Sequence, residues 1–418
     1  MRILVAFFLL ALSGANVLAA EIAGTWRSDT PRPRALVIQP GKSGYHGFYY
    51  LLESEAAGTA ISLTSSKDGK VTFKLIPRYS VFDGKISADG KMLSGSWTTL
   101  QGTTPLNFTR ADPNWKFDPA PHRALRIEVE KSVSLEVLDF GGTGKPLVFI
   151  PGSGNTAHIF DAFAPKFTAK HHVYAITRRG WGESDIPPAT AENYDADRMG
   201  DDVLAVLAAL KIEKPVLIGH SFAGEEMSSI GTRFPDRVSG LIYLDAGYSY
   251  AFYNPDLELS ASVEADSLRR KLAALVNLQP SQWPAATRDI SDSMARLNKH
   301  MSYYDELAAG LKDETNPKAF AQPSTQVVQA MEQGMHAYTG IKPPILVIYA
   351  TPKPCAPACN DPDYLRRTRD ETAQADVVEK SYPSGRVVRI PRANHYVFRS
   401  HEAEVMKEVN TFLDGVGQ

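Results

Sequence analysis

Two sequence patterns predict an α/β fold with a mostly parallel sheet, preceded by a smaller antiparallel β domain. From about residue 124 onward, short continuous apolar runs alternate with stretches of helical spacing. Such runs are typical of strands that are buried on both faces of a parallel sheet. Over 21–110, shorter alternating runs are separated by Asp-Gly turns, which is typical of antiparallel hairpins.

The composition fits a large globular protein and excludes several other classes. The chain has 418 residues, of which 43% are hydrophobic and 22% charged, and its net charge is −2. This balance excludes wholesale disorder and a strongly basic surface, so we expect no nucleic-acid partner. At roughly 100–200 residues per domain, the length predicts two or three domains.

Residues 1–20 have the pattern of a secretory signal peptide. Arg2 precedes an apolar run over 3–12, and small residues follow, so cleavage is expected after Ala19 or Ala20. The apolar run is shorter than the ~20 residues that a membrane span needs. We therefore expect a periplasmic or secreted protein without stable membrane insertion after cleavage; an uncleaved anchor is the alternative.

Residues 21–110 are expected to form the antiparallel β domain. Turn signals separate its alternating runs: Asp68-Gly69, Asp83-Gly84 and Asp89-Gly90. Gly24-Thr25-Trp26, the stretch 82–90 and Gly95-Ser96-Trp97 resemble a small lipocalin-like β module that precedes the catalytic domain of some secreted bacterial hydrolases. We expect Trp26 and Trp97 to lie in the core of this module.

A linker is expected over 111–123, where three prolines occur, and the α/β domain is expected over 124–418. Alternation over 125–130 and 133–139 predicts a hairpin. The buried strands are predicted at 146–150, 172–177, 215–218, 241–244, 344–349 and 387–390. Helical spacing between these runs predicts helices that cover the sheet.

The chemistry-bearing motif is the segment Gly219-His220-Ser221-Phe222-Ala223-Gly224. It follows the predicted strand 215–218 directly and precedes a predicted helix over 224–233. A serine on such a sharp strand-to-helix turn is typical of a nucleophile elbow, which raises the hydroxyl above the sheet edge. Small residues on either side let the strand and helix approach closely. Gly219 and Ala223 hold these positions, although glycine is more common at the second.

With this motif, the chain from about 124 to 415 resembles the α/β-hydrolase superfamily. Pro151-Gly152-Ser153-Gly154 stands where the family carries its oxyanion loop, with Pro151 in place of the usual histidine. Residues 177–185 match the family's arginine-glycine-aromatic-glycine-x-serine turn. We expect Arg179, Gly180 and Ser184 in this turn to be structural.

The resemblance implies a catalytic serine, acid and histidine in that chain order. His395 lies after the last predicted strand and before the C-terminal helix, where the family has its histidine. Asp245 directly follows the predicted strand 241–244, the acid position of some branches of the family. Asp361 and Asp363, which come after the next predicted strand, are the alternatives.

These residues imply acyl transfer. His395 would take the proton of Ser221, and Asp245 would orient the imidazole. Backbone N–H groups of Phe222 and of Ser153 or Gly154 would bind the oxyanion. We expect no metal and no organic cofactor, because the sequence has no zinc-helix motif, phosphate-binding loop or dinucleotide fingerprint.

An insertion over about 248–341 is expected to form a helical cap over the active site, as in the family. Six of its apolar residues either line a substrate pocket or pack the cap on the core: Tyr248, Tyr250, Phe252, Tyr253, Met331 and Met335. Cys355 and Cys359 are the only cysteines. In an oxidising compartment we expect a local disulfide, with two free thiols as the alternative.

Together these features predict a secreted serine hydrolase that cleaves a carboxylic ester of a small or medium acyl substrate. An amidase or aminopeptidase of the proline-iminopeptidase type is the alternative. It would need a cap carboxylate to hold the substrate amine, and the candidates are Glu264, Asp266, Asp305 and Glu306. A non-catalytic binding protein on the same fold is a third hypothesis. The expected partner is a small-molecule substrate.

Overall fold

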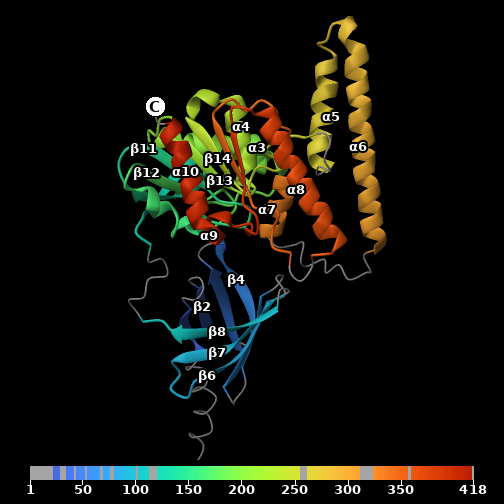
Figure 1. The fold of residues 1–418 in the computed structure, drawn as a ribbon. Coiled ribbons are helices and arrows are strands. Elements are labelled where there is room, and N and C mark those ends of the chain that lie inside the picture. The colour runs from blue at the N-terminus through green and yellow to red at the C-terminus, as the bar shows by residue number, and fades with distance from the viewer. Residues whose placement is uncertain are drawn as a thin grey trace, which may run out of the picture. The chain divides into compact units, whose positions relative to one another are not determined.

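The computed structural model describes residues 22–28, 34–41, 44–51, 54–65, 69–75, 80–99, 102–112, 120–254, 261–310, 323–355 and 359–416. The chain divides into two compact units, Met1–Ala120 and Pro121–Gln418 (Figure 1). The predicted signal peptide over 1–20 lies outside the described residues. Within the described ranges, no helix has both the length and the apolarity that crossing a membrane requires.

The first unit is an eight-stranded antiparallel sheet that closes into a barrel, which confirms the predicted β domain. Consecutive strands pair with each other, and β1 also pairs with β8. The strands are β1 (Gly24–Ser28), β2 (Arg34–Gly41), β3 (Gly44–Leu51), β4 (Ser54–Ser65), β5 (Lys70–Leu75), β6 (Ser80–Ile86), β7 (Met92–Thr99) and β8 (Gly102–Arg110). The likeness to a lipocalin-like module stays a prediction.

Aromatic side chains form the core of this barrel. Trp26, Phe73, Phe82 and Phe108 are fully buried. The rings of Phe73 and Phe82 stack with centroids 4.8 Å apart, and Trp97 lies against Phe73 at 5.9 Å. Both tryptophans therefore belong to the core of the barrel.

The second unit is built on an eight-stranded, mostly parallel sheet. Its strand order is β16-β15-β14-β13-β11-β12-β10-β9. The strand β10 is antiparallel to both of its neighbours, β9 and β12, and the other pairs are parallel. The strands are β9 (Arg123–Glu130), β10 (Val133–Gly141), β11 (Lys145–Ile150), β12 (His171–Ile176), β13 (Val216–His220), β14 (Gly240–Leu244), β15 (Ile345–Tyr349) and β16 (Arg386–Arg389). This is the sheet of the α/β-hydrolase fold, so the predicted fold class is confirmed.

Helices cover both faces of this sheet. Alternate residues of a strand point to opposite faces, so they pack in two separate hydrophobic cores. Val148 of β11 packs in one core, which also contains residues of α3, α4 and α8. Its neighbour Phe149 packs in the other core, with residues of η1, η2 and α10. The helices are η1 (Ala157–Phe160), η2 (Ala164–Phe167), α2 (Ala191–Tyr194), α3 (Ala196–Ala209), α4 (Ala223–Arg233), η3 (Pro235–Arg237), α8 (Pro362–Ser381), α9 (Val397–Ser400) and α10 (Glu402–Val416).

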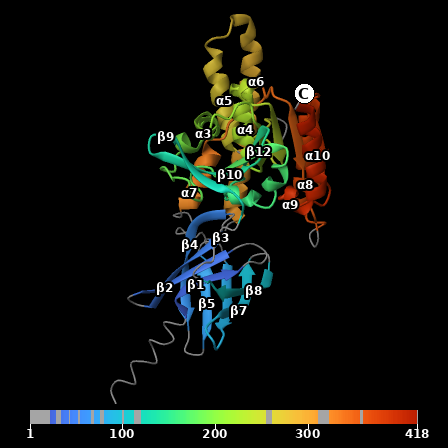
Figure 2. The same ribbon diagram turned by 90° about the vertical axis from the view of Figure 1, so that its left-hand side faces the viewer.

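The insertion between β14 and β15 is helical, as expected, but its longest helices extend away from the sheet. α5 (Ala261–Leu275) and α6 (Trp283–Gly310) lie side by side and form a projecting hairpin with η4 (Pro280–Gln282) between them (Figures 1 and 2). α7 (Pro323–Gln333) instead packs on the body, where Met331 contacts the buried cluster of Trp181 and Tyr194.

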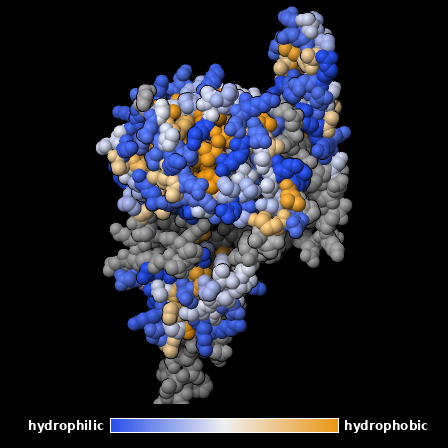
Figure 3. Space-filling model, viewed as in Figure 1, coloured by the Kyte–Doolittle hydropathy of each residue, from blue (hydrophilic) through white to orange (hydrophobic). Residues whose placement is uncertain are grey.

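The projecting hairpin carries apolar side chains in solvent. Leu272, Val276 and Trp283 near its tip are 49%, 83% and 50% exposed, and no charged residue occurs over 272–287. Orange and tan patches mark apolar residues on this part of the surface (Figure 3).

Candidate active site

Ser221 sits on the sharp turn between β13 and α4 that the sequence predicts. Its φ is +52°, in the left-handed region that a serine adopts only when its surroundings hold it there. Its N–H donates to the Leu244 carbonyl at 3.2 Å. A Cβ at Gly219 would lie 2.6 Å from Met227 Sδ and 3.0 Å from Ala223 Cβ, so a larger residue there would force α4 or the Met227 side chain to shift. Ala223 fits because it is small and wholly buried.

Asp245 follows β14 directly and also has a left-handed backbone, with φ +46°. Its side chain is fully buried, so both carboxylate oxygens need partners. The Ala350 N–H donates to Oδ1 at 2.9 Å, and the Tyr248 hydroxyl donates to the same oxygen at 2.7 Å. Oδ2 is left to face the imidazole of His395.

The structure brings Ser221, His395 and Asp245 into one hydrogen-bonded row. His395 Nε2 lies 2.8 Å from Ser221 Oγ, and His395 Nδ1 lies 2.7 Å from Asp245 Oδ2. The residues come from the turns that follow β13, β14 and β16, whose carboxyl ends meet at one edge of the sheet. This is the geometry in which a histidine can take a serine proton while a carboxylate orients it.

A second layer of polar side chains surrounds the acid, and no sequence pattern predicted it. Lys353 Nζ lies 3.7 Å from Asp245 Oδ2 and donates to the Tyr248 hydroxyl and to Glu371. Burial raises the pKa of Asp245, but the hydrogen bond with His395 and the Lys353 charge outweigh it, so the pKa is lowered overall. Asp245 is therefore held as a carboxylate. The sequence feature that could have indicated this layer is Lys353, a lysine in the turn after β15.

His220 packs behind the elbow as a neutral ring. Its Nε2 hydrogen-bonds to the backbone carbonyl of His395 at 2.9 Å, and its ring stacks on Tyr396 at 4.9 Å. Complete burial is the main cause that lowers its pKa to about 3. A ring that stays neutral can hold the His395 turn in place without adding charge beside it.

The segments expected to supply oxyanion donors lie next to Ser221. The backbone at Gly152 passes so close that a Cβ there would lie 2.9 Å from Ser221 Cβ. Ser153 and Gly154 follow in the same turn, and Gly154 has φ +73°. Phe222 is the N-cap residue of α4. Its N–H and that of Ser153 donate to no backbone carbonyl within the described part of the chain.

A buried ion pair fixes the loop that begins at Pro151. Arg178 donates to the Pro151 carbonyl at 2.6 Å and to Glu226 of α4 at 2.6 Å. Both side chains are almost inaccessible to solvent. In the neighbouring turn, Arg179 was expected to be structural. It binds Asp202 through two hydrogen bonds of 2.6 Å.

Tyr250 is an insertion residue that packs beside the nucleophile. Its ring stacks on Phe222, the residue after Ser221, with centroids 5.2 Å apart. Met335 and Val263 of α5 pack on the same two rings. The other residues named for this region have different contacts. Phe252 lies in the core that contains Val148, Met331 packs against Trp181, and the Tyr248 hydroxyl donates a hydrogen bond to Asp245.

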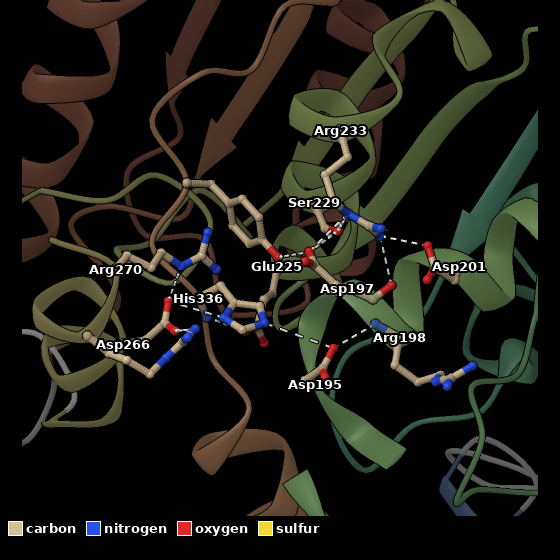
Figure 4. A network of polar contacts seen from close by, with 12 residues as sticks. Asp195, Asp197, Arg198, Asp201, Glu225, Ser229, Arg233, Asp266, Arg270 and His336 are labelled. Atoms are coloured by element: carbon tan, nitrogen blue, oxygen red, sulfur yellow. Dashed lines mark hydrogen bonds and ion pairs between the residues drawn. The ribbon is translucent and has the colours of Figure 1, made fainter. Parts of the chain in front are cut away.

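A polar network fastens the insertion to the body. Figure 4 shows His336 between Asp195, at the start of α3, and Asp266 of α5. His336 Nδ1 lies 3.2 Å from Asp266, and its backbone N–H donates to the buried Glu225 at 3.2 Å. Asp197 of α3 accepts hydrogen bonds from Tyr338 and from Ser229 of α4, the helix that follows Ser221.

Of the two alternative acids, Asp361 is not part of this row. Asp361 is exposed and caps the N-terminus of α8, where it accepts a hydrogen bond from the Tyr364 N–H at 3.0 Å. The side chain of Asp363 lies outside the described residues. Cys355 and Cys359 form the expected disulfide.

The fold and the site define a hydrolase of the α/β class, and the comparisons with known proteins agree. Residues 147–408, more than half of the chain, match the model of the Alpha/beta hydrolase family. The chain belongs to this family.

Individual relatives are distant. The chain is 22% identical over 283 residues to the 2-(acetamidomethylene)succinate hydrolase of Mesorhizobium japonicum, covering 65% of this chain and 89% of the relative. It is 26% identical over 212 residues to the 2-hydroxy-6-oxononadienedioate/2-hydroxy-6-oxononatrienedioate hydrolase of Escherichia coli, covering 49% and 73%. Among solved structures, a thermophilic esterase from Thermogutta terrifontis is 19% identical with a TM-score of 0.45, covering 71% and 100%.

Proposed function

We propose that the protein is a secreted serine hydrolase that cleaves a carboxylic ester of a small or medium acyl substrate. The observation that carries this proposal is the hydrogen-bonded row of Ser221, His395 and Asp245. A non-catalytic protein on the same fold would have no reason to keep two strained, non-glycine residues at positive φ beside the histidine.

In this mechanism Ser221 Oγ attacks the ester carbonyl while His395 Nε2 takes its proton. Asp245 stabilises the imidazolium that forms, and the N–H groups of Phe222 and of Ser153 or Gly154 bind the oxyanion. Removing one such donor typically costs about 3 kcal/mol in the barrier. His395 then protonates the leaving alcohol, and water hydrolyses the acyl-enzyme by the same route.

An aminopeptidase is less well supported, because the two candidate carboxylates whose side chains are described, Glu264 and Asp266, already have cationic partners. Glu264 is fully buried and pairs with Arg296 at 3.1 Å. Asp266 pairs with Arg269, Arg270 and His336. Neither carboxylate is available to hold a substrate amine. The side chains of Asp305 and Glu306 lie outside the described residues.

Export to the periplasm or the medium is part of the proposal. It is supported by the signal-like pattern of residues 1–20 and by the Cys355–Cys359 disulfide, which is stable in an oxidising compartment.

The test combines a covalent probe with two substrates. The wild-type protein is expected to react with a fluorophosphonate and to hydrolyse p-nitrophenyl acetate faster than the matching anilide, and Ser221→Ala is expected to do neither. Probe labelling that persists in Ser221→Ala would contradict the assignment of the nucleophile. Hydrolysis of the anilide or of dipeptides without ester hydrolysis would favour the amidase.

A further inference from the structure

Two histidines and a carboxylate gather inside the second unit, in a place that the proposed reaction does not use. His122 comes just before β9, while His158 and Asp161 belong to η1 and its C-cap. The side chains of His122, His158 and Asp161 are only 3%, 5% and 19% exposed. Such a group is not a solvated surface cluster.

The spacing of the three side chains fits a single metal ion. His158 Nδ1 lies 3.1 Å from Asp161 Oδ2, and His122 Nε2 lies 3.8 Å from Asp161 Oδ1. One ligand atom from each residue lies within 4.8 Å of the others. Ligands bound tetrahedrally to zinc at about 2.0–2.1 Å stand roughly 3.3 Å apart. The two distances to Asp161 lie on either side of this value, the first ending on Oδ2 and the second on Oδ1.

A fourth residue orients one of these histidines as metal sites commonly require. His158 Nε2 lies 3.4 Å from Glu136 Oε1 on β10, so the second ring nitrogen already faces a carboxylate. A histidine that donates its other N–H to a carboxylate is fixed in the tautomer that leaves the first nitrogen for the metal. Here that nitrogen is Nδ1, which points at Asp161.

We propose that His122 Nε2, His158 Nδ1 and Asp161 bind one divalent transition-metal ion, with Zn²⁺ as the expected ion. Two imidazoles and one carboxylate suit zinc, cobalt or nickel, whereas calcium and magnesium prefer sites made of oxygen alone. The sequence shows no motif for this site, because His122 is far along the chain from the other two residues.

The ion would link the start of β9 to the loop that carries the oxyanion donors. Glu136 also accepts a hydrogen bond from Thr177 Oγ1, which in turn accepts one from the Ala157 N–H. Ala157 begins η1 directly after the loop 151–156. The metal is therefore a structural ion that braces this loop, and it takes no part in the acyl transfer.

The test measures metal binding by the whole mature chain, purified without a polyhistidine tag and stripped with a chelator. Calorimetric titration with Zn²⁺ is expected to show one ion per chain and a rise in melting temperature. Glu136→Gln, which removes the orienting carboxylate, is expected to weaken binding by roughly 10–100-fold, and His122→Asn, which removes a ligand, by at least as much. His172→Asn is the matched control, because His172 pairs with Asp139 in the same sheet outside the cluster.

A second measurement does not depend on the variants folding. Co²⁺ bound to the wild-type protein is expected to give visible absorption bands of a nitrogen- and oxygen-ligated ion of low coordination number, and Zn²⁺ is expected to displace it. The proposal is overturned if the stripped wild-type protein shows no saturable uptake of Zn²⁺ or Co²⁺. It is also overturned if folded His122→Asn binds Zn²⁺ as tightly as the wild-type protein.

Discussion

Two regions of the second unit differ in how their side chains are held. One is the sheet edge at Ser221, and the other is the hairpin of α5 and α6. At the sheet edge, Asp245, His395 and Ser221 are held by hydrogen bonds to one another and to the Ala350 backbone, and Ser221 and Asp245 have a strained backbone. The outer part of the hairpin has exposed apolar side chains such as Val276, and its ion pairs lie at the surface. Substitutions in the first region should therefore alter chemistry or stability strongly, and substitutions in the second should alter them little.

The largest effect is expected at Asp245. Asp245→Asn is expected to lower kcat on p-nitrophenyl acetate by roughly 10³–10⁴-fold, because an amide cannot stabilise the imidazolium of His395. Asp361→Asn is the matched control, since that carboxylate caps α8 instead. Full activity in the first variant, or its loss only in the second, would mean that the acid is elsewhere.

The buried ion pair beside the oxyanion loop should dominate stability. Arg178→Met leaves Glu226 buried without its cation, and is expected to lower the free energy of unfolding by about 3–5 kcal/mol, measured by urea titration. Adding Glu226→Leu removes the second charge and should restore much of this loss. If the double variant is as unstable as Arg178→Met, the cost comes from lost contacts with Pro151 and not from the buried charge.

The disulfide should matter less, because its loop is short. Closing a five-residue loop restricts the unfolded chain by about 2 kcal/mol. Replacing Cys355 and Cys359 by serine should therefore lower the melting temperature by only a few degrees, with activity retained. Maleimide labelling of the unreduced, unfolded wild-type protein should detect no free thiol. Labelling of two thiols would show that the disulfide does not form.

Lys353 should tune the pH dependence more than the rate. Its charge helps to keep the pKa of Asp245 low, so Lys353→Met lets this carboxylate take up a proton at a higher pH. As pH falls, kcat/KM should then be lost earlier, with the acid limb shifted upward by about one unit or less. Lys353→Arg should keep the wild-type profile. A limb that moves downward in Lys353→Met would show that the lysine does not act on Asp245.

The difference between the sheet edge and the longer connections explains which site residues could be predicted from sequence. Ser221, Asp245 and His395 each directly follow a buried strand or lie in the turn after one, and parallel strands bring such turns to one edge. The contacts of Lys353, Tyr248 and Glu371 around Asp245 were not predicted, because they depend on the path of two long connections, which no periodicity encodes. Tyr248 was named only as a pocket or packing residue. The direction of the α5–α6 hairpin was also beyond prediction, because amphipathic spacing shows which face of a helix is buried but not where the helix points.

The two tryptophans of the second unit put the contrast to its finest test. Trp181 is buried against Tyr194 and Met331, so Trp181→Ala is expected to lower the free energy of unfolding by about 3–5 kcal/mol. Trp283 is 50% exposed near the hairpin tip, so Trp283→Ala should change it by no more than about 0.5 kcal/mol. Trp283→Ala should also leave kcat/KM on p-nitrophenyl acetate unchanged. A loss of kcat/KM in Trp283→Ala that occurs only with longer acyl chains would show that the hairpin contacts the substrate in solution. The hairpin would then act as a cap and would adopt a second position besides the extended one.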